Sequence, residues 1–429
     1  MKALQPLLLA ADARGDIYED PDRLMLCRRG RDLALPRPDE LMPLPEESEL
    51  FLLPGRRALG YNPESGEVEE VEDSAVAAFA APAHTLTAHP AYRGEPGSPV
   101  LPLFAYGAVG YAHGRIYVCA KKVDDDPRQM FGGISAKKLR RSALELAEAF
   151  PENRLVQQLI RRCALTYSCP AARNFCLGRY EAPLPVSRRC NARCVGCISR
   201  QEQGSKICAA PQSRLEFTPS PEEVVEVMRL HQGRAEAPIY SFGQGCEGEP
   251  LTESGLLEES IRRFRAQGGE GTVNLNSNAS MPGEIARLCA AGLSSLRVSL
   301  NSAREESYLR YYRPVNFSFA QVLGSIDEAK SRGVFVSLNL LFFPGFTDTE
   351  LEFQALEELA LETRLDCVQL RNLNIDPEYY LDLMQGVETG PGLGFGNFKK
   401  RLLKACPWLK LGYFNPVLPL LCLWFCLFA

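Results

Sequence analysis

The sequence predicts an α/β protein whose main domain is a parallel sheet flanked by helices. Apolar segments of strand length alternate with amphipathic helix segments about six times between residues 181 and 390, which is the pattern of βαβ units. The segment 334–345 is apolar almost throughout, as expected of a strand that is buried on both faces. Polar residues follow most of these strands. Because the carboxyl ends of parallel strands share one edge, we expect the functional site at that edge.

The composition is that of a folded protein and restricts the function. The chain has 429 residues, of which 45% are apolar and 24% are charged, enough for roughly two or three domains. Its net charge is −5 and no run of Lys and Arg dominates, which argues against tight, sequence-independent binding to nucleic acid. Its four histidines lack the pair spacing of zinc enzymes. Fifteen cysteines in a long acidic chain indicate metal or redox chemistry in the reducing cytoplasm rather than a disulfide framework.

Residues 1–180 predict an N-terminal α+β domain of unknown role. The first residues, MKALQPLLLAADARGD, have the outline of a signal peptide, but Pro6 interrupts a very short apolar run, so we predict a first strand. The remainder combines strand segments, one hairpin turn and two amphipathic helices. These predicted elements are strands at 24–29 and 49–61, a turn at 61–68, and helices at 135–150 and 151–165.

The predicted helices between 181 and 390 carry start and stop signals. Ser220 and Glu223 predict a capping box around Pro221, and Thr347 with Glu350 predicts a second one. The predicted strands are 182–187, 237–243, 271–278, 295–302, 334–345 and 367–374, and the predicted helices are 217–232, 252–269, 280–292, 318–333 and 347–365.

The stretch CNARCVGC, residues 190–197, places three cysteines with the spacing C-x3-C-x2-C just after the first of these strands. A thiolate is a soft ligand suited to zinc or to iron–sulfur clusters. A closed zinc site needs four ligands, and Cys208 or Cys246 would have to supply the fourth. A [4Fe–4S] cluster can instead be held by three cysteines, which leaves one iron open to another molecule.

A second motif accompanies the cysteines, because GCEGEPL, residues 245–251, follows the second predicted strand. Later strands end in NLNSN (274–278), LRVSLNS (296–302) and VSLNLLFFPGFTD (336–348). This order of motifs over 181–390 resembles the radical S-adenosylmethionine (SAM) superfamily, whose corresponding motif is GGEP. The resemblance implies a partial (β/α)6 TIM-like barrel at 181–390, preceded by the N-terminal domain and followed by a C-terminal extension at 391–429.

The resemblance also implies cofactors and a reaction class. Cys190, Cys194 and Cys197 would bind three irons of a [4Fe–4S] cluster, and SAM would chelate the fourth. An electron from a donor such as ferredoxin or flavodoxin would cleave SAM to methionine and a 5′-deoxyadenosyl radical, which abstracts hydrogen from a substrate. The acidic charge favours a small molecule, or a peptide or protein, over RNA as substrate. The alternatives are a radical SAM enzyme that modifies RNA and a non-catalytic iron–sulfur or zinc protein.

The motif residues are the candidates for SAM binding. By resemblance Glu249 would hold the SAM ammonium, although a carboxylate here could also serve only to start a helix. Gly248 would allow close backbone approach and Pro250 would stiffen the turn. The family often has an aromatic residue before the third cysteine, where this chain has Gly196. The other candidates, which could equally be solvated strand ends, are Asn276, Asn278, Ser299 and Asn301.

Other cysteines carry two interpretations each. Cys246 is either a packed residue or a redox-active neighbour of the cysteine motif. The group Cys163, Cys169 and Cys176 is either packed or part of a second cluster.

Two further features have an open role. Arg371 and Asn374 on the last predicted strand would face substrate or pair with carboxylates of the sheet. The apolar segment 415–429 is too short to span a bilayer. We predict that it docks against protein, with a membrane anchor as the alternative.

Overall fold

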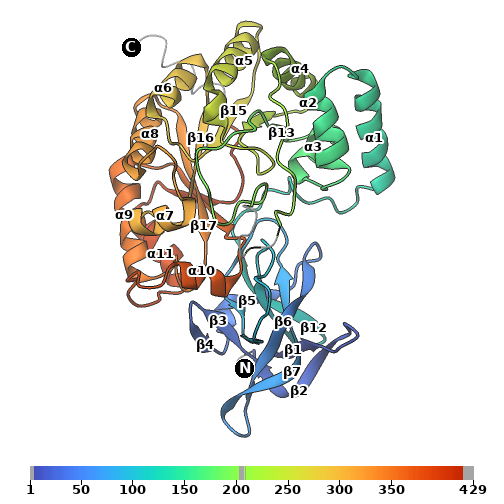
Figure 1. Ribbon diagram of the computed structural model, residues 1–429, viewed down its shortest axis with the longest axis vertical. Coiled ribbons are helices and arrows are strands. Elements are labelled where there is room, and N and C mark those ends of the chain that lie inside the picture. The colour runs from blue at the N-terminus through green and yellow to red at the C-terminus, as the bar shows by residue number, and fades with distance from the viewer. Residues whose placement is uncertain (1–3, 202–206, 208, 419–429) are drawn as a thin grey trace.

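The computed structural model describes residues 4–201, 207 and 209–418. It consists of an antiparallel part at the N-terminus and a seven-stranded parallel sheet with its helices (Figure 1). The α/β class predicted from the sequence is confirmed for the second part, because every neighbouring strand pair in that sheet is parallel.

The N-terminal part is built from a nine-stranded sheet and a three-stranded sheet. Strand β1 (Leu7–Ala11) occupies the apolar run that the sequence predicted as a strand. The longest hairpin joins β6 (Glu49–Asn62) to β7 (Glu67–Phe79) across the predicted turn. The remaining strands are β2 (Ile17–Met25), β3 (Cys27–Arg29), β4 (Asp32–Ala34), β5 (Leu41–Pro43), β8 (His84–Leu86), β9 (His89–Pro90), β10 (Tyr92–Gly94), β11 (Gly107–Ala112) and β12 (Arg115–Lys122), and η1 (Pro38–Glu40) is a short 3-10 turn.

A helical segment links the two parts. It comprises α1 (Ala136–Ala149), α2 (Arg154–Gln157), which continues as the π-helical stretch η2 (Gln158–Ala164), and α3 (Pro170–Leu177). Its buried side chains belong to the same apolar core as the parallel sheet, whereas the N-terminal sheets have separate cores. The helices predicted at 135–150 and 151–165 therefore exist, but they pack with the parallel sheet and not with the strands that precede them.

The parallel sheet runs in chain order. Its strands are β13 (Glu181–Leu184), β14 (Ile239–Phe242), β15 (Thr272–Ser277), β16 (Ser295–Leu300), β17 (Phe335–Phe342), β18 (Cys367–Asn372) and β19 (Lys410–Gly412). The first six correspond to the six predicted strands. Strand β19, which lies beyond residue 390, was not predicted. A strand of three residues is too short to show a periodic pattern in the sequence.

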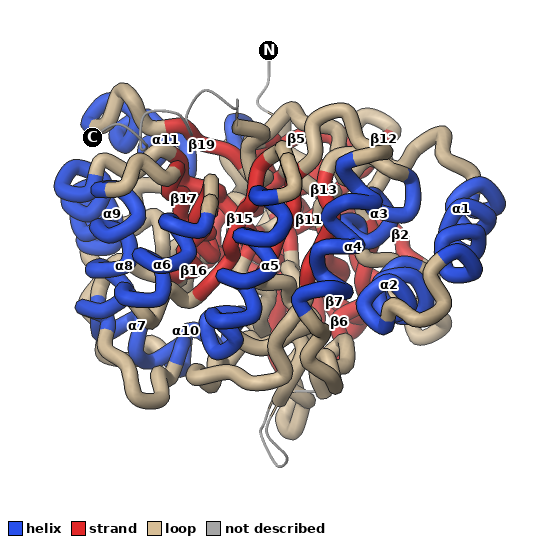
Figure 2. The backbone as a smooth tube through the Cα atoms, turned by 90° about the horizontal axis from the view of Figure 1, so that it is seen from above, coloured by secondary structure: helices blue, strands red, loops and turns tan. Residues whose placement is uncertain are grey.

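Helices surround this sheet on its outer side (Figure 2). The Ser220–Glu223 capping box is confirmed at α4. The Thr347–Glu350 box is wrong, because Thr349 is the residue at the helix start and the Thr347 hydroxyl accepts a hydrogen bond from the amide of Phe343 instead. The helices are α4 (Pro221–Gln232), η3 (Pro250–Glu253), α5 (Ser254–Ala266), α6 (Pro282–Ala291), α7 (Glu305–Tyr312), α8 (Phe319–Ser331), α9 (Glu350–Thr363), α10 (Pro377–Leu383) and α11 (Phe395–Ala405).

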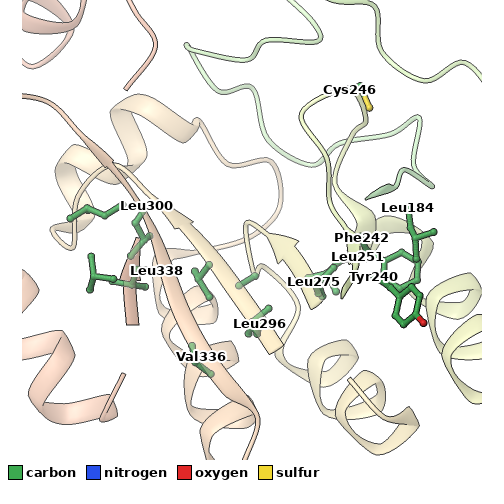
Figure 3. Close-up of a cluster of buried hydrophobic side chains, with 14 of the residues drawn as sticks. Leu184, Tyr240, Phe242, Cys246, Leu251, Leu275, Leu296, Leu300, Val336 and Leu338 are labelled. Atoms are coloured by element: carbon green, nitrogen blue, oxygen red, sulfur yellow. The ribbon is translucent and has the colours of Figure 1, made fainter. Parts of the chain in front are cut away.

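The two faces of the parallel strands differ. Leu275, Leu296 and Leu338 lie in the main apolar core, where they pack toward the helices (Figure 3). Alternate residues point to the opposite, concave side and are largely polar. The two edges of the sheet approach each other, since the Asn415 amide after β19 donates to Glu181 of β13 at 3.1 Å and to Ser241 of β14 at 3.3 Å.

The N-terminal part is docked firmly onto the parallel sheet. Arg56 forms a buried 2.8 Å ion pair with Asp376, which starts α10. The Gly30 amide donates to Pro344 at 3.0 Å, and a Cβ on Gly30 would lie 2.7 Å from the carbonyl oxygen of Gly345. Backbones approach so closely here that only glycine fits, which fixes the relative orientation of the two parts.

Within the described part of the chain, no helix is both long and apolar enough to cross a membrane. The predicted docking of 415–429 falls mainly on residues 419–429, which lie outside the described residues.

Candidate functional site

The three motif cysteines lie on the loop after β13 and line one cavity. Cys190, Cys194 and Cys197 are partly buried and border a cavity of about 350 Å³. The loop is held against the end of α7, where the amide of Val195 donates to Tyr311 at 3.0 Å. A long loop of this kind needs such anchors to present its thiols in a fixed arrangement.

Three thiols around one cavity are a donor set that an iron–sulfur cluster can use. Within the described part of the chain, no three His, Cys, Asp or Glu side chains are grouped as ligands of one metal ion. A zinc ion would need sulfur atoms about 4 Å apart, given Zn–S bonds of about 2.3 Å, whereas the thiolates of a four-iron cluster bind at separate corners and stand farther apart.

The surroundings of the thiols supply positive charge. Arg193, Arg200, Arg214 and Arg313 all border the cavity. Arg214 donates from Nη2 to the Cys197 sulfur at 3.4 Å and from Nε to the Ser199 hydroxyl at 3.2 Å. Cationic donors of this kind offset the negative charge that bound thiolates bring.

Burial raises the pKa of two of the three motif thiols. Burial, followed by the charge of Glu249, raises the pKa of Cys190 to about 11. Burial likewise raises the pKa of Cys194 well above its usual value. Metal binding at this loop must therefore displace protons, as it does at other thiolate sites.

The second motif is tied directly to the cysteine loop. The amide of Gly248 donates to Ser187 at 2.7 Å and the amide of Glu249 donates to Arg189 at 2.8 Å. A Cβ on Gly248 would lie 1.9 Å from the Arg189 carbonyl oxygen. The close backbone approach predicted for Gly248 is therefore present, and its partner is the residue before Cys190. Pro250 begins η3, as expected of a residue that stiffens the turn.

Glu249 is buried and hydrogen-bonded on both oxygens. One oxygen accepts from the Ser277 hydroxyl at 2.5 Å and from the Leu251 amide at 3.1 Å, and the other accepts from the Asn278 amide at 2.9 Å. Glu249 therefore does cap the start of η3, as the helix-start interpretation expects. A carboxylate can accept about four hydrogen bonds, so capacity for a cationic ligand remains. Burial raises the pKa of Glu249 to about 7, and a neighbouring cation would favour its ionised form.

Sequence reasoning missed Glu247. One of its oxygens accepts from the amides of Val186 and Ser187, and the other accepts from the amides of Gly243 and Gln244, all at 2.7–2.9 Å. This buried carboxylate joins the end of β13 to the turn after β14. A glutamate at the first glycine position of GGEP was the signal that could have revealed it.

The family description "Radical SAM superfamily" matches residues 184–354, the stretch that holds both motifs. Residues 184–354 therefore match a radical SAM domain. Enzymes of this superfamily use a [4Fe–4S] cluster and SAM.

Parts of the chain are also similar to individual known proteins. A protein named GTP 3′,8-cyclase from Lactiplantibacillus plantarum is 28% identical over 175 residues, which are 39% of this chain and 47% of that protein. Another of the same name from Ectopseudomonas mendocina is 31% identical over 185 residues, 43% of this chain and 51% of that protein. The chain thus spans about half the length of the curated relatives it matches. Among solved structures, HydG, a maturase of the [FeFe]-hydrogenase, aligns at 16% identity with a TM-score of 0.38, covering 65% of this chain and 67% of that one.

Two of the candidate asparagines connect the elements of the radical SAM domain. The Asn278 amide group donates to the Asn191 side chain in the cysteine loop at 2.8 Å. Asn276 donates to the Gly243 carbonyl at 3.0 Å and accepts from Asn274 at 2.8 Å. Both are almost fully buried, which is not the state of a solvated strand end.

Ser299 on β16 and Asn301 just after it lie in different surroundings. The Ser299 hydroxyl accepts from Asn339 at 3.4 Å on the concave side of the sheet. Asn301 instead donates to Ser307 and to the Tyr380 hydroxyl, at 3.1 and 3.2 Å, beneath α7 and α10. The structure therefore brings Ser299, but not Asn301, to the concave face.

An aromatic residue from another element occupies the space beside Gly196. A Cβ at Gly196 would lie 2.4 Å from the hydroxyl oxygen of Tyr311 on α7. Sequence reasoning did not predict α7, so this aromatic neighbour of the cysteine loop was missed.

The other cysteines singled out from the sequence lie in or against the main apolar core. The thiols of Cys163 and Cys246 contact each other in the core, with Cys169 close enough to influence Cys246 electrostatically. Cys176 is buried, and its carbonyl accepts a hydrogen bond from Arg234. The thiols of Cys163 and Cys246 join the helical segment to the GEP motif.

Proposed function

We propose that this chain is a radical SAM enzyme that cleaves SAM reductively and uses the resulting 5′-deoxyadenosyl radical to abstract hydrogen from a small-molecule substrate. The observation that carries the proposal is the direct connection between the two motifs. Three thiols line one cavity, and the loop that holds them is hydrogen-bonded at Ser187 and Arg189 to Gly248 and Glu249.

Each motif residue has a role in this proposal. Cys190, Cys194 and Cys197 hold the cluster, which supplies the electron for cleavage when bound. Glu249 pairs with the ammonium group of SAM, and Gly248 and Pro250 set the backbone of that loop. Asn278 keeps the third strand at a fixed distance from the cysteine loop through Asn191. Asn276 and Ser299 offer hydrogen bonds to the remaining polar groups of SAM, and Asn301 supports α7 and α10 from below.

We further propose that β13–β19 form the partial barrel of this superfamily. The bridge from Asn415 to Glu181 and Ser241 supports a strongly curved sheet. The shared core of α1–α3 with that sheet favours a domain boundary between β12 and α1 rather than at residue 180. The N-terminal part would then present residues to the substrate side, and a cytoplasmic low-potential donor would supply the electron.

The test is anaerobic reconstitution of the full chain, followed by reduction with dithionite in the presence of SAM. We expect about four irons per chain from this site and formation of 5′-deoxyadenosine and methionine, measured by mass spectrometry. Because the curated relatives are named for GTP, GTP is the first substrate to add.

The matched control is the triple variant Cys190→Ala, Cys194→Ala, Cys197→Ala, which should lose both the iron and the cleavage. A wild-type protein that is colourless and loaded with zinc after oxygen-free purification would overturn the proposal.

A further inference from the structure

Two adjoining hollows beside the cysteine loop are lined by arginines. The cavity of about 350 Å³ that the motif cysteines border is also lined by Arg193, Arg200, Arg214 and Arg313. A second hollow, of about 420 Å³, is lined by Arg193, Leu309, Arg313, Pro314 and Val315. Three of these residues line both hollows, and the second hollow contains none of the cysteines. The arginines therefore extend beyond the thiolates whose charge Arg214 offsets.

The charge at these hollows is opposite in sign to that of the whole chain. The chain has a net charge of −5, yet the segments 188–201 and 307–315 together hold six arginines and no Asp or Glu. In the described part of the chain, the lining of both hollows likewise includes no carboxylate. Arg189 and Arg310 pair with Glu253 and Glu306, which line neither hollow. An acidic molecule is therefore attracted to this side, although the chain as a whole repels it.

Backbone hydrogen bonds hold the two segments together as one surface. The amide of Arg193 in the cysteine loop donates to the carbonyl of Tyr312 at the end of α7, at 3.1 Å. Next to this bond, Ala192 and Pro314 form an antiparallel bridge. The cysteine loop and the end of α7 are therefore fixed against each other. A surface that is already formed costs less to bind than one that must first be ordered.

This surface combines charge with exposed apolar area. Leu309 on α7 is 39% exposed, and it lines the second hollow together with Arg313, four residues further along the chain. Arginine and apolar side chains occur together in many protein interfaces, and electron-transfer complexes often bury less than about 1,200 Å². We define the arginine face as Arg193, Leu309, Arg313, Pro314 and Val315.

The arginine face lies next to the cysteines. Arg193 directly precedes Cys194 in the chain, and Arg193 and Arg313 border the same cavity as the three thiols. An electron passes between two proteins at a useful rate only over a short distance, because the rate of tunnelling falls steeply with distance. A protein seated on this face is therefore well placed to give an electron to a cluster held by the thiols.

We propose that the arginine face is the docking site of the electron donor and that this donor is a small acidic protein. The word donor rests on the function proposed above, but docking itself requires neither SAM nor turnover. When a cluster is bound, the docked donor gives one electron to it and is itself oxidised by that electron, with no bond made or broken. Electrostatic attraction steers such a partner to the face and weakens as the salt concentration rises.

The experiment measures binding of two acidic donor proteins, oxidised flavodoxin and oxidised ferredoxin, to the anaerobically reconstituted full chain by surface plasmon resonance. At least one of them should bind at low salt, and its binding should weaken as salt is added. Arg313→Glu should weaken this binding roughly tenfold, mainly through a slower association rate. Leu309→Glu should weaken it several-fold, since it adds negative charge and removes an apolar contact at a residue that lines only the second hollow.

Each variant has a control that makes the same change elsewhere on the surface. Arg141→Glu, at a side chain that is 72% exposed on α1, and Leu361→Glu, at a residue that is 45% exposed on α9, should bind the donor like wild type. Neither residue lines either hollow. Because the net charge changes equally within each pair of variants, the controls separate the effect of this face from that of the total charge.

Three results would overturn the proposal. Neither donor binds the wild type at low salt, or binding does not depend on salt, or the two variants weaken binding no more than their controls. If Arg313→Glu does not fold or retains less iron, judged by circular dichroism and iron analysis, Leu309→Glu decides alone. These measurements need no cleavage of SAM, and cleavage driven by dithionite needs no docked protein, so each proposal is tested by its own assay.

Discussion

The N-terminal sheets and the parallel sheet bury their apolar side chains in different ways. The N-terminal strands divide their buried residues among small clusters, such as the one around Met25, Cys27 and Ala108. The parallel sheet shares a single core that extends from α1 to α11. Small cores contribute little stability by themselves, so the first part depends on its contacts with the second.

The two parts also differ in what they contribute to the candidate site. The cysteine loop and the GEP motif both belong to the large core, while the N-terminal part supplies Arg28 and Arg56, which pair with Glu378 and Asp376 at α10. Tyr379 of the same helix borders both the cavity lined by the three motif cysteines and a cavity of about 520 Å³ next to Arg56. Helix α10 therefore connects the N-terminal part to the cavity lined by the cysteines.

The largest expected effect comes from breaking the buried contact between the two parts. Arg56→Ala leaves Asp376 buried without its cation, which should lower the free energy of unfolding by about 3–5 kcal/mol. Urea denaturation followed by circular dichroism measures it. The control is Arg31→Ala, because Arg31 pairs with Asp382 and both side chains are more than 60% exposed. That change should cost at most about 1 kcal/mol, and equal losses in the two variants would mean that the parts are stable independently.

An intermediate effect is expected on the SAM affinity of the parallel part when Glu249 is changed. Glu249→Gln removes a charge and places an amide N–H₂ opposite backbone donors. SAM affinity of the reconstituted protein should fall by about 1.5–3 kcal/mol. Glu222→Gln is the control, since Glu222 pairs with Arg263 away from the motifs and its side chain is 65% exposed, so SAM affinity should be unchanged. If both variants bind SAM like wild type, Glu249 only starts η3.

The smallest effect concerns one methyl group in the cysteine loop. Gly196→Ala would place a Cβ against the Tyr311 hydroxyl, and such overpacking costs about 1–3 kcal/mol. Adding Tyr311→Phe removes the obstructing oxygen and should recover most of the loss in thermal unfolding. The N-terminal part should be unaffected by either change. Failure of the second substitution to restore stability would show that the glycine is required for backbone reasons instead.

The elements that could be predicted from the sequence are those with a clear repeat of apolar residues, a capping signal or a chemical motif. The capping box at Ser220, the apolar strand β17 and the order of cysteine and GEP motifs all have local signals. Helix α7 was missed, because its Tyr308, Tyr311 and Tyr312 face the core without the longer periodicity of an amphipathic helix.

The contacts that define the candidate site could not be read from local patterns. Glu247 accepts from amides on two separate loops, and Arg297 meets Gln369 from two strands further along the sheet. Such pairs are set by strand register, which appears only once the sheet is assembled. Arg371 illustrates the same point, since neither of its predicted partners, substrate or carboxylate, anticipated the ring of Tyr413.

The bridge made by Asn415 sets the order in which a newly made chain can complete this site. The two edges of the parallel sheet cannot be bridged until residue 415 has left the ribosome, because the side-chain amide of Asn415 makes that bridge. Translation at about 5–20 residues per second places the thiol of Cys190 in the cell roughly 10–45 seconds earlier. During that interval the cysteine loop exists without the bridge between the sheet edges that Asn415 completes.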